Sequence, residues 1–155
     1  MGLESVRAWL ESHAPDLPII EVAASTATVA EAAEALGVEP GRIAKTLALR
    51  VNKEVVLVVA RGDARLDNGK SKAAFGGRPR MLGAEETREL TGHPVGGVCP
   101  FALATPLKVY CDRSLQAFEE VFPAAGSLNS SVRVSPARLA ELVAVAWVDV
   151  CKVAG

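Results

Sequence analysis

The chain has 155 residues, of which 50% are hydrophobic and 23% charged, and its formal net charge is −1. This length and apolar content predict one globular domain over residues 1–155 and exclude a disordered chain. The small net charge provides no global attraction to nucleic acid, and the 5% of aromatic residues argues against extensive base stacking, so binding of a polyanion would require a local patch.

Cysteine and histidine usage argues against a metal centre and against disulfide bonds. The three cysteines are an odd number without metal-ligand spacing, and the chain has two histidines. The N-terminus lacks a basic start followed by an apolar run, and no uncharged apolar stretch has the length of a bilayer. We therefore expect a cytoplasmic protein with no signal peptide, no metal, no cofactor and no membrane partner.

The first 40 residues carry helix and strand signals in turn. Apolar residues recur at helical spacing at Leu3, Val6, Trp9 and Leu10. This spacing predicts an amphipathic helix over the first dozen residues, and a short strand is expected at 19–22. Thr28-Val29-Ala30-Glu31 is a capping box, which predicts a helix that ends at Gly37.

Two apolar runs at 43–51 and 55–60 predict a β-hairpin, because only Asn52-Lys53 lies between them. Alternation places four residues on one face of the first strand: Ile43, Lys45, Leu47 and Leu49. Lys45 therefore lies in an apolar row. Such a lysine either extends its ammonium to water at the strand end or is held there for a function.

The segment 61–80 is the basic part of the chain. It has two acidic residues and six basic ones, namely Arg61, Arg65, Lys70, Lys72, Arg78 and Arg80. In a chain of net charge −1, this local excess favours a polyanionic partner. A solvated helix face is the alternative explanation.

A glycine-rich loop follows a predicted helix at 85–91 that ends at Gly92. Gly96 and Gly97 lie between two prolines that stiffen the chain. A stiff loop with outward-facing amides is suited to hold a carbonyl oxygen or an oxyanion. A tight connection to the next strand is the alternative.

The last third of the chain mixes strand and helix patterns. Strands are expected at 107–111, 130–134 and 145–150, with a turn or short helix at 114–120. Ser135-Pro136 predicts the start of a helix that runs to about residue 143. The order of elements predicts an α/β fold of the α+β type, with a mixed sheet flanked by helices.

Together these segments resemble the YbaK family of aminoacyl-tRNA editing domains. Four motifs carry the resemblance: the lysine strand Ile43-Ala44-Lys45-Thr46-Leu47, the following strand and Gly-Asp turn at 56–63, the Gly-x-x-x-Pro loop from Gly96 to Pro100, and the small-residue loop Ala124-Ala125-Gly126-Ser127 with the helix start Ser135-Pro136. They occur in the family's order over about residues 20–151.

The resemblance implies a compact mixed-sheet fold and hydrolysis of the ester between a wrongly attached amino acid and the terminal adenosine of tRNA. Several members act on tRNA-Pro that carries alanine or cysteine, and others accept serine or threonine. The length of this chain leaves no room for a synthetase, so we expect a free-standing, trans-acting enzyme. Its expected partners are mischarged aminoacyl-tRNA and prolyl-tRNA synthetase.

The resemblance also implies which residues form the site. The catalytic set would be Lys45, Gly96, Gly97, Val98, Cys99 and Pro100. Loop amides would stabilise the oxyanion, and Lys45 would hold a phosphate of the terminal nucleotide or the aminoacyl group. Substrate would be bound by Thr46, His93, Gly126 and Ser127, and tRNA by the six basic residues of 61–80. Water or a substrate group would be the nucleophile, since no Ser-His-Asp set is visible.

Two features depart from the family pattern and leave the amino acid open: Cys99 within the loop, and Leu128-Asn129 after Ser127. Two alternative functions also remain at this point. One is a thiol hydrolase in which Cys99 is the nucleophile and His93 its base, although no third, orienting group is evident. The other is a non-catalytic module that binds tRNA or a synthetase.

Overall fold

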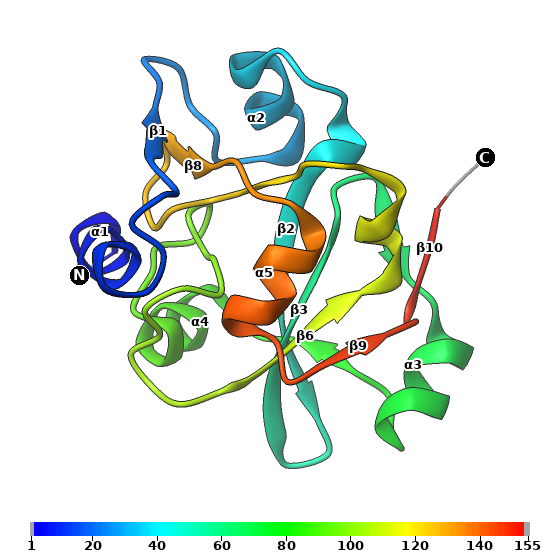
Figure 1. The fold of residues 1–155 in the computed structure, drawn as a ribbon. Coiled ribbons are helices and arrows are strands. Elements are labelled where there is room, and N and C mark those ends of the chain that lie inside the picture. The colour runs from blue at the N-terminus through cyan, green and yellow to red at the C-terminus, as the bar shows by residue number, and fades with distance from the viewer. Residues whose placement is uncertain (1, 154–155) are drawn as a thin grey trace.

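A mixed sheet forms the centre of the molecule, in a computed structural model that describes residues 2–153 (Figure 1). Its strands lie in the order β5 (Arg80–Met81), β2 (Ile43–Val51), β3 (Glu54–Arg61), β6 (Lys108–Asp112) and β9 (Ala146–Val148), and β7 (Phe122–Pro123) pairs with β2. The hairpin β2–β3 and the pair β2–β5 are antiparallel, whereas β3–β6, β6–β9 and β2–β7 are parallel. The predicted mixed sheet is thus confirmed.

The other strands of residues 2–153 form two small antiparallel sheets. One joins β1 (Ile19–Glu21) to β8 (Ser130–Val132), and the other joins β4 (Ala64–Leu66) to β10 (Cys151–Val153). The single strand expected at 145–150 is therefore wrong, because the chain passes from β9 to β10 in another sheet. At the break, the N–H of Val150 donates to Asp112 Oδ1 at 2.8 Å and its carbonyl accepts from the N–H of Asp67 at 2.8 Å.

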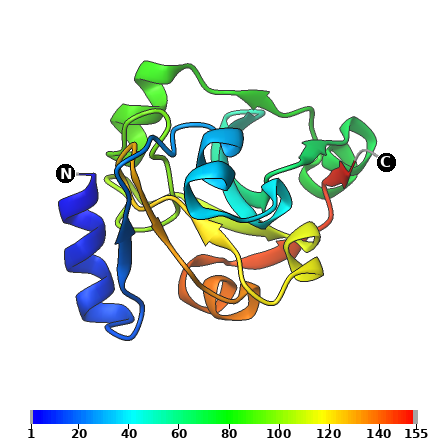
Figure 2. The same ribbon diagram turned by 90° about the horizontal axis from the view of Figure 1, so that it is seen from above.

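The described residues form five α-helices around the sheets: α1 (Leu3–His13), α2 (Val29–Leu36), α3 (Asn68–Phe75), α4 (Ala84–Thr91) and α5 (Pro136–Val143), with 3-10 turns at Pro40–Arg42 and Arg113–Ala117. The predicted caps are confirmed, since Thr28 Oγ1 accepts from the N–H of Glu31 at 3.1 Å and Ser135 Oγ from the N–H of Arg138 at 3.1 Å. In Figures 1 and 2, α1 lies at the side of the molecule next to β1.

The alternation of β2 and β3 divides the core into two layers. Leu57 and Val59 face a cluster that includes residues of α1 and α5, and Figure 2 shows α5 on one side of the sheet. Leu49 and Val58 face the opposite cluster, which includes Phe75 of α3 and residues of β4 and β10. Residues of α2 pack with the start of β2 and with β7.

Residues 2–153 contain neither a membrane-spanning helix nor a cluster of metal ligands. No helix in this range is long and apolar enough to cross a membrane. The same residues contain no group of three or more His, Cys, Asp or Glu side chains that is placed to hold a metal ion.

Candidate active site

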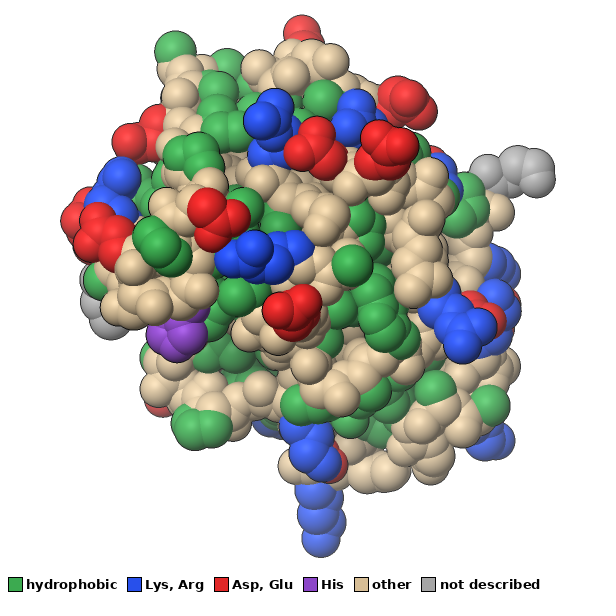
Figure 3. All heavy atoms as spheres, in the orientation of Figure 1, with side chains coloured by type: hydrophobic (Ala, Val, Ile, Leu, Met, Phe, Trp, Pro, Cys, Tyr) green, Lys and Arg blue, Asp and Glu red, His purple; other side chains and the backbone are tan. Residues whose placement is uncertain are grey.

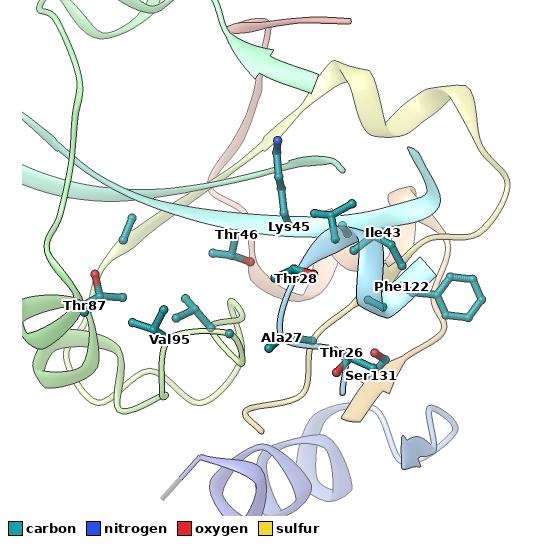
Figure 4. A pocket seen from close by; sticks show the side chains of 18 of the residues that line it. Thr26, Ala27, Thr28, Ile43, Lys45, Thr46, Thr87, Val95, Phe122 and Ser131 are labelled. Carbon is teal, nitrogen blue, oxygen red and sulfur yellow. The ribbon is translucent and has the colours of Figure 1, made fainter. Parts of the chain in front are cut away.

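A cavity of about 280 Å³ lies where the outer edge of β2 is interrupted. This edge pairs with β7 at Ile43–Ala44 and with β5 at Leu49–Arg50, and within the described chain no strand covers the residues between. The cavity is walled by β2, the segment 26–29, α4, the loop 95–98 and residues of β7 and β8 (Figure 4). Elements far apart in the sequence therefore meet at one gap in the sheet.

Thr46 offers backbone hydrogen-bonding groups to this gap. The carbonyl of Ala48 accepts from the N–H of Leu82 at 3.0 Å, which shows that Ala48 directs its backbone groups to the outer edge. Alternate residues of a strand direct their N–H and C=O to the same edge, so those of Thr46 also point outward, toward the cavity. The N–H of Thr46 is thus available as a donor, and its C=O as an acceptor, for a small ligand in the cavity.

The cavity wall is mostly apolar but contains two unsatisfied hydroxyls. Thr26 Oγ1 and Thr46 Oγ1 are buried and have no hydrogen-bond partner among residues 2–153. Their side chains belong to the wall, and Figure 4 shows Thr46 on the cavity side of β2. An apolar cavity with a few placed polar groups is typical of a small-molecule site.

Lys45 belongs to the cavity wall, but its side chain leaves β2 on the side opposite Thr46 (Figure 4). Its Nζ donates to the carbonyl of Gly62 at 3.2 Å and to that of Ala64. Burial lowers the pKa of this half-buried lysine from its ordinary value. The ammonium is therefore held at the turn between β3 and β4 rather than extended freely to water or directed into the cavity.

The glycine loop reaches the cavity through Gly96 and Val98. Gly96 has a φ of 93°, in the left-handed region that favours glycine. The N–H of Gly97 donates to the carbonyl of Pro94 at 2.9 Å, so the turn itself uses this predicted oxyanion donor. A Cβ on Gly97 would lie 2.8 Å from the backbone N and O of Ser127, which shows that the loops 94–98 and 126–128 are in direct contact.

Cys99 and His93 lie together behind the loop, outside the cavity wall. Both are 0% exposed, with Cys99 Sγ 3.5 Å from His93 Nε2. The Nε2–H donates to the carbonyl of Phe101 at 2.7 Å, and burial lowers the pKa of His93. Burial raises the pKa of the Cys99 thiol to about 12, so this cysteine stays protonated at neutral pH.

The remaining predicted loop residues also lie outside the cavity wall. Pro100 is buried, and Gly126 contacts Gly2 so closely that a Cβ on Gly126 would lie 2.6 Å from the Gly2 carbonyl carbon. The Ser127 hydroxyl is hydrogen-bonded to Ser130 and, at 3.1 Å, to Asn129 Oδ1. These residues pack around the loop 94–98 and do not themselves line the cavity.

The basic segment lies mainly on another part of the surface, and two of its six basic residues are neutralised in place. Arg61 pairs with Asp63 at 2.5 Å and Lys70 with Asp149 at 3.0 Å. Four are exposed without an acidic partner among the described residues: Arg65, Lys72, Arg78 and Arg80. Figure 3 shows basic side chains at the edge where α3 and β10 lie. Arg80 connects the segment to the cavity, since it precedes the wall residue Met81 in β5.

Several wall residues had no signal in the sequence. Thr26, Thr87, Met81 and Ser131 come from separate elements, and only their long-range packing brings them together. Val95 joins Gly96 and Val98 as a wall residue from the loop that the sequence singled out, and it is 53% exposed.

Comparisons with known proteins agree on one family. Residues 23–142 match the family described as "Aminoacyl-tRNA editing domain". The chain is 47% identical over 154 residues to "Uncharacterized protein YwhH" of Bacillus subtilis, covering 98% of each chain. It is 30% identical over 112 residues to "Putative Cys-tRNA(Pro)/Cys-tRNA(Cys) deacylase EbsC" of Enterococcus faecalis, covering 71% of this chain and 68% of that one.

A solved structure shows the same fold. It is described as "Crystal structure of a putative trans-editing enzyme for prolyl tRNA synthetase" and has a TM-score of 0.88 to this chain at 37% identity. The match covers 97% of this chain and 96% of that one.

Proposed function

We propose, because the chain belongs to the aminoacyl-tRNA editing domain family, that it hydrolyses the ester of mischarged aminoacyl-tRNA as a trans-acting deacylase. The observation that carries this proposal is the cavity at the gap in β2, whose volume of about 280 Å³ suits a small aminoacyl group. The substrates we propose are tRNA-Pro carrying a small amino acid such as alanine or cysteine, with serine and threonine in the same class. Prolyl-tRNA synthetase is the proposed partner.

The backbone of Thr46 is suited to orient an aminoacyl ester. Its outward carbonyl would accept a hydrogen bond from the substrate's α-ammonium, and its outward N–H would donate to an oxygen of the substrate. Both groups are fixed by the strand, so they need no reorganisation when the substrate binds. Thr46 thus serves as the binding residue at the centre of the proposed site.

Hydrolysis requires attack of water on the ester carbonyl carbon, and the attacking water loses a proton to solvent. The carbonyl electron pair moves to oxygen, and the resulting oxyanion is stabilised by backbone donors. Of the predicted loop residues, Gly96 and Val98 belong to the cavity wall, so their amides are the candidate donors, whereas the N–H of Gly97 already donates to the carbonyl of Pro94. Collapse of the intermediate breaks the bond to the ribose oxygen, which leaves with a proton from solvent.

Lys45 fits the role of a phosphate anchor better than that of an aminoacyl contact. Its ammonium is directed away from the cavity and lies beside Gly62, within the basic segment (Figure 4). A point charge at that place suits a phosphate of the terminal nucleotides while the esterified amino acid enters the cavity.

The test is hydrolysis of tRNA-Pro carrying labelled alanine, cysteine, serine, threonine or proline by the purified chain. We expect release of at least one small amino acid at a rate well above the spontaneous rate, and slower release of proline. Binding of these tRNAs without any hydrolysis would contradict the proposal and favour a non-catalytic module.

The double variant Arg78→Gln/Arg80→Gln is expected to bind tRNA more weakly. Each lost phosphate contact should reduce the slope of log affinity against log salt by about one. The control is Arg7→Gln/Arg138→Gln, which removes two partly exposed, ion-paired charges from α1 and α5. Filter binding at a series of salt concentrations measures both slopes. An unchanged slope in Arg78→Gln/Arg80→Gln would show that these two arginines are solvated and do not contact tRNA phosphates.

The variant Cys99→Ala is expected to retain deacylation within about threefold of the wild-type rate, because a protonated thiol outside the cavity is no nucleophile. Loss of buried volume should cost roughly 1 kcal/mol of stability. Cys111→Ala is the control, since Cys111 is also 0% exposed. Complete loss of activity in a folded Cys99→Ala protein would establish the thiol mechanism instead.

A further inference from the structure

The two unsatisfied hydroxyls of the cavity bear on which amino acid is removed. We infer that Thr26 and Thr46 select an aminoacyl group with a side-chain hydroxyl, so that serine is the preferred small substrate rather than alanine or cysteine. This inference rests on the proposed function and specifies the substrate class of the same site.

The contrast among the four threonines of the cavity wall is the first argument. Thr28 Oγ1 caps α2, and Thr87 Oγ1 donates to the carbonyl of Gly83 at 2.8 Å. Thr26 and Thr46 have no such partner among the described residues, although both oxygens are buried. Local structure therefore accounts for two of these hydroxyls and leaves the other two without a role in the fold.

An unpartnered buried hydroxyl is unfavourable, so its presence calls for an explanation. Thr26 is only 6% exposed, and its N–H already donates to the carbonyl of Leu128 at 2.6 Å, which fixes the backbone at that place. Valine would fill nearly the same volume at either position without the polar atom. A ligand that hydrogen-bonds both hydroxyls would supply the partners that the fold does not.

The positions of Thr26 and Thr46 allow one substrate to contact both side chains. Both side chains belong to the cavity wall, and they come from opposite parts of it, the segment 26–29 and β2 (Figure 4). Their oxygens are covered by neighbouring atoms. Contact with a substrate therefore requires a rotation of about 120° about the Cα–Cβ bond, from one staggered rotamer to the next, that turns each oxygen toward the cavity.

The chemistry of the substrate then decides the preference. A serine side chain both donates and accepts a hydrogen bond, so it can pair with two threonine hydroxyls at once. Alanine leaves both unpaired, and the cysteine thiol is a weak donor and acceptor. Sites built to hydrogen-bond a substrate hydroxyl discriminate strongly against analogues that lack it.

The experiment compares single-turnover hydrolysis of Ser-tRNA-Pro and Ala-tRNA-Pro by wild type, Thr26→Val and Thr46→Val. We expect the wild type to favour serine by at least roughly tenfold, and each valine variant to reduce the serine-to-alanine rate ratio by at least about tenfold. Thr26→Ser and Thr46→Ser keep the hydroxyl and should keep the ratio. Thr105→Val, outside the cavity wall, is the matched control and should leave the ratio unchanged.

The outcomes separate this inference from the proposed function. If the wild type hydrolyses Ala-tRNA-Pro at least as fast as Ser-tRNA-Pro, or if the valine variants keep the wild-type ratio, the hydroxyls are not the selecting groups although the enzyme is a deacylase. If the wild type hydrolyses no mischarged tRNA, both statements are wrong. Where one valine variant fails to fold, the ratio of the other valine variant and the wild-type preference decide.

Discussion

Lys45→Ala is expected to slow single-turnover hydrolysis of the best substrate by at least about a hundredfold, or about 2.7 kcal/mol of transition-state stabilisation. The charge lies beside the basic segment while Thr46 faces the cavity, so its removal should misplace the terminal nucleotide and the ester together (Figure 4). Quenched single-turnover reactions at saturating enzyme measure the hydrolysis rates of the wild type and the variant.

The same variant is expected to lower the thermal midpoint. The carbonyls of Gly62 and Ala64 lose their donor, and each lost hydrogen bond of this kind costs roughly 1 kcal/mol. Lys45→Met is the control for packing, because it keeps most of the apolar stem and removes the charge. If Lys45→Met is less stable but hydrolyses its substrate at the wild-type rate, Lys45 holds only the β3–β4 turn and has no part in the reaction.

Gly97→Ala is expected to destabilise the fold by about 1–3 kcal/mol and to reduce the hydrolysis rate at least tenfold at a temperature where the variant is folded. The added methyl would lie 2.8 Å from backbone atoms of Ser127, and backbone cannot yield as a flexible side chain does. The loop must then move, and it carries Gly96 and Val98 of the cavity wall with it.

A second glycine provides the control for this substitution. Gly69 lies in α3, and a Cβ there would meet only Asp67 Oδ1 at an ordinary 3.4 Å. Gly69→Ala should therefore leave the rate unchanged and raise stability by roughly 0.5–1 kcal/mol. A stable Gly97→Ala protein with full activity would show that the contact between the two loops is unimportant.

Local sequence signals predicted the elements whose ends are determined by short-range contacts. Thr28 and Ser135 accept from the N–H three residues later, and the hairpin turns at Asn52, which has a φ of 57°. The short strands β4, β5 and β10 had no such signal, because each exists only through pairing with a distant partner. Helix α3 was missed because its apolar residues have no clear helical spacing, although Asp67 caps it.

The site was predictable only in part, for a geometric reason. Alternation placed Lys45 and Thr46 on opposite faces of a strand, but it did not reveal which face meets the cavity. That depends on the interrupted edge of β2, which the distant strands β5 and β7 create. The contribution of Thr26 depends on the same long-range assembly, so no local pattern marked it.

The most direct test of the cavity as the substrate site is amide chemical-shift mapping with a stable substrate analogue. The ligand is 3′-amino-3′-deoxyadenosine 5′-phosphate acylated with serine or alanine, in which an amide replaces the ester. We predict that the largest shifts occur at the amides of four cavity-wall residues, Thr26, Thr46, Gly96 and Val98. Shifts confined to the separate hollow at Trp9 and Leu103, or to the basic segment 61–80, would contradict hydrolysis in this cavity.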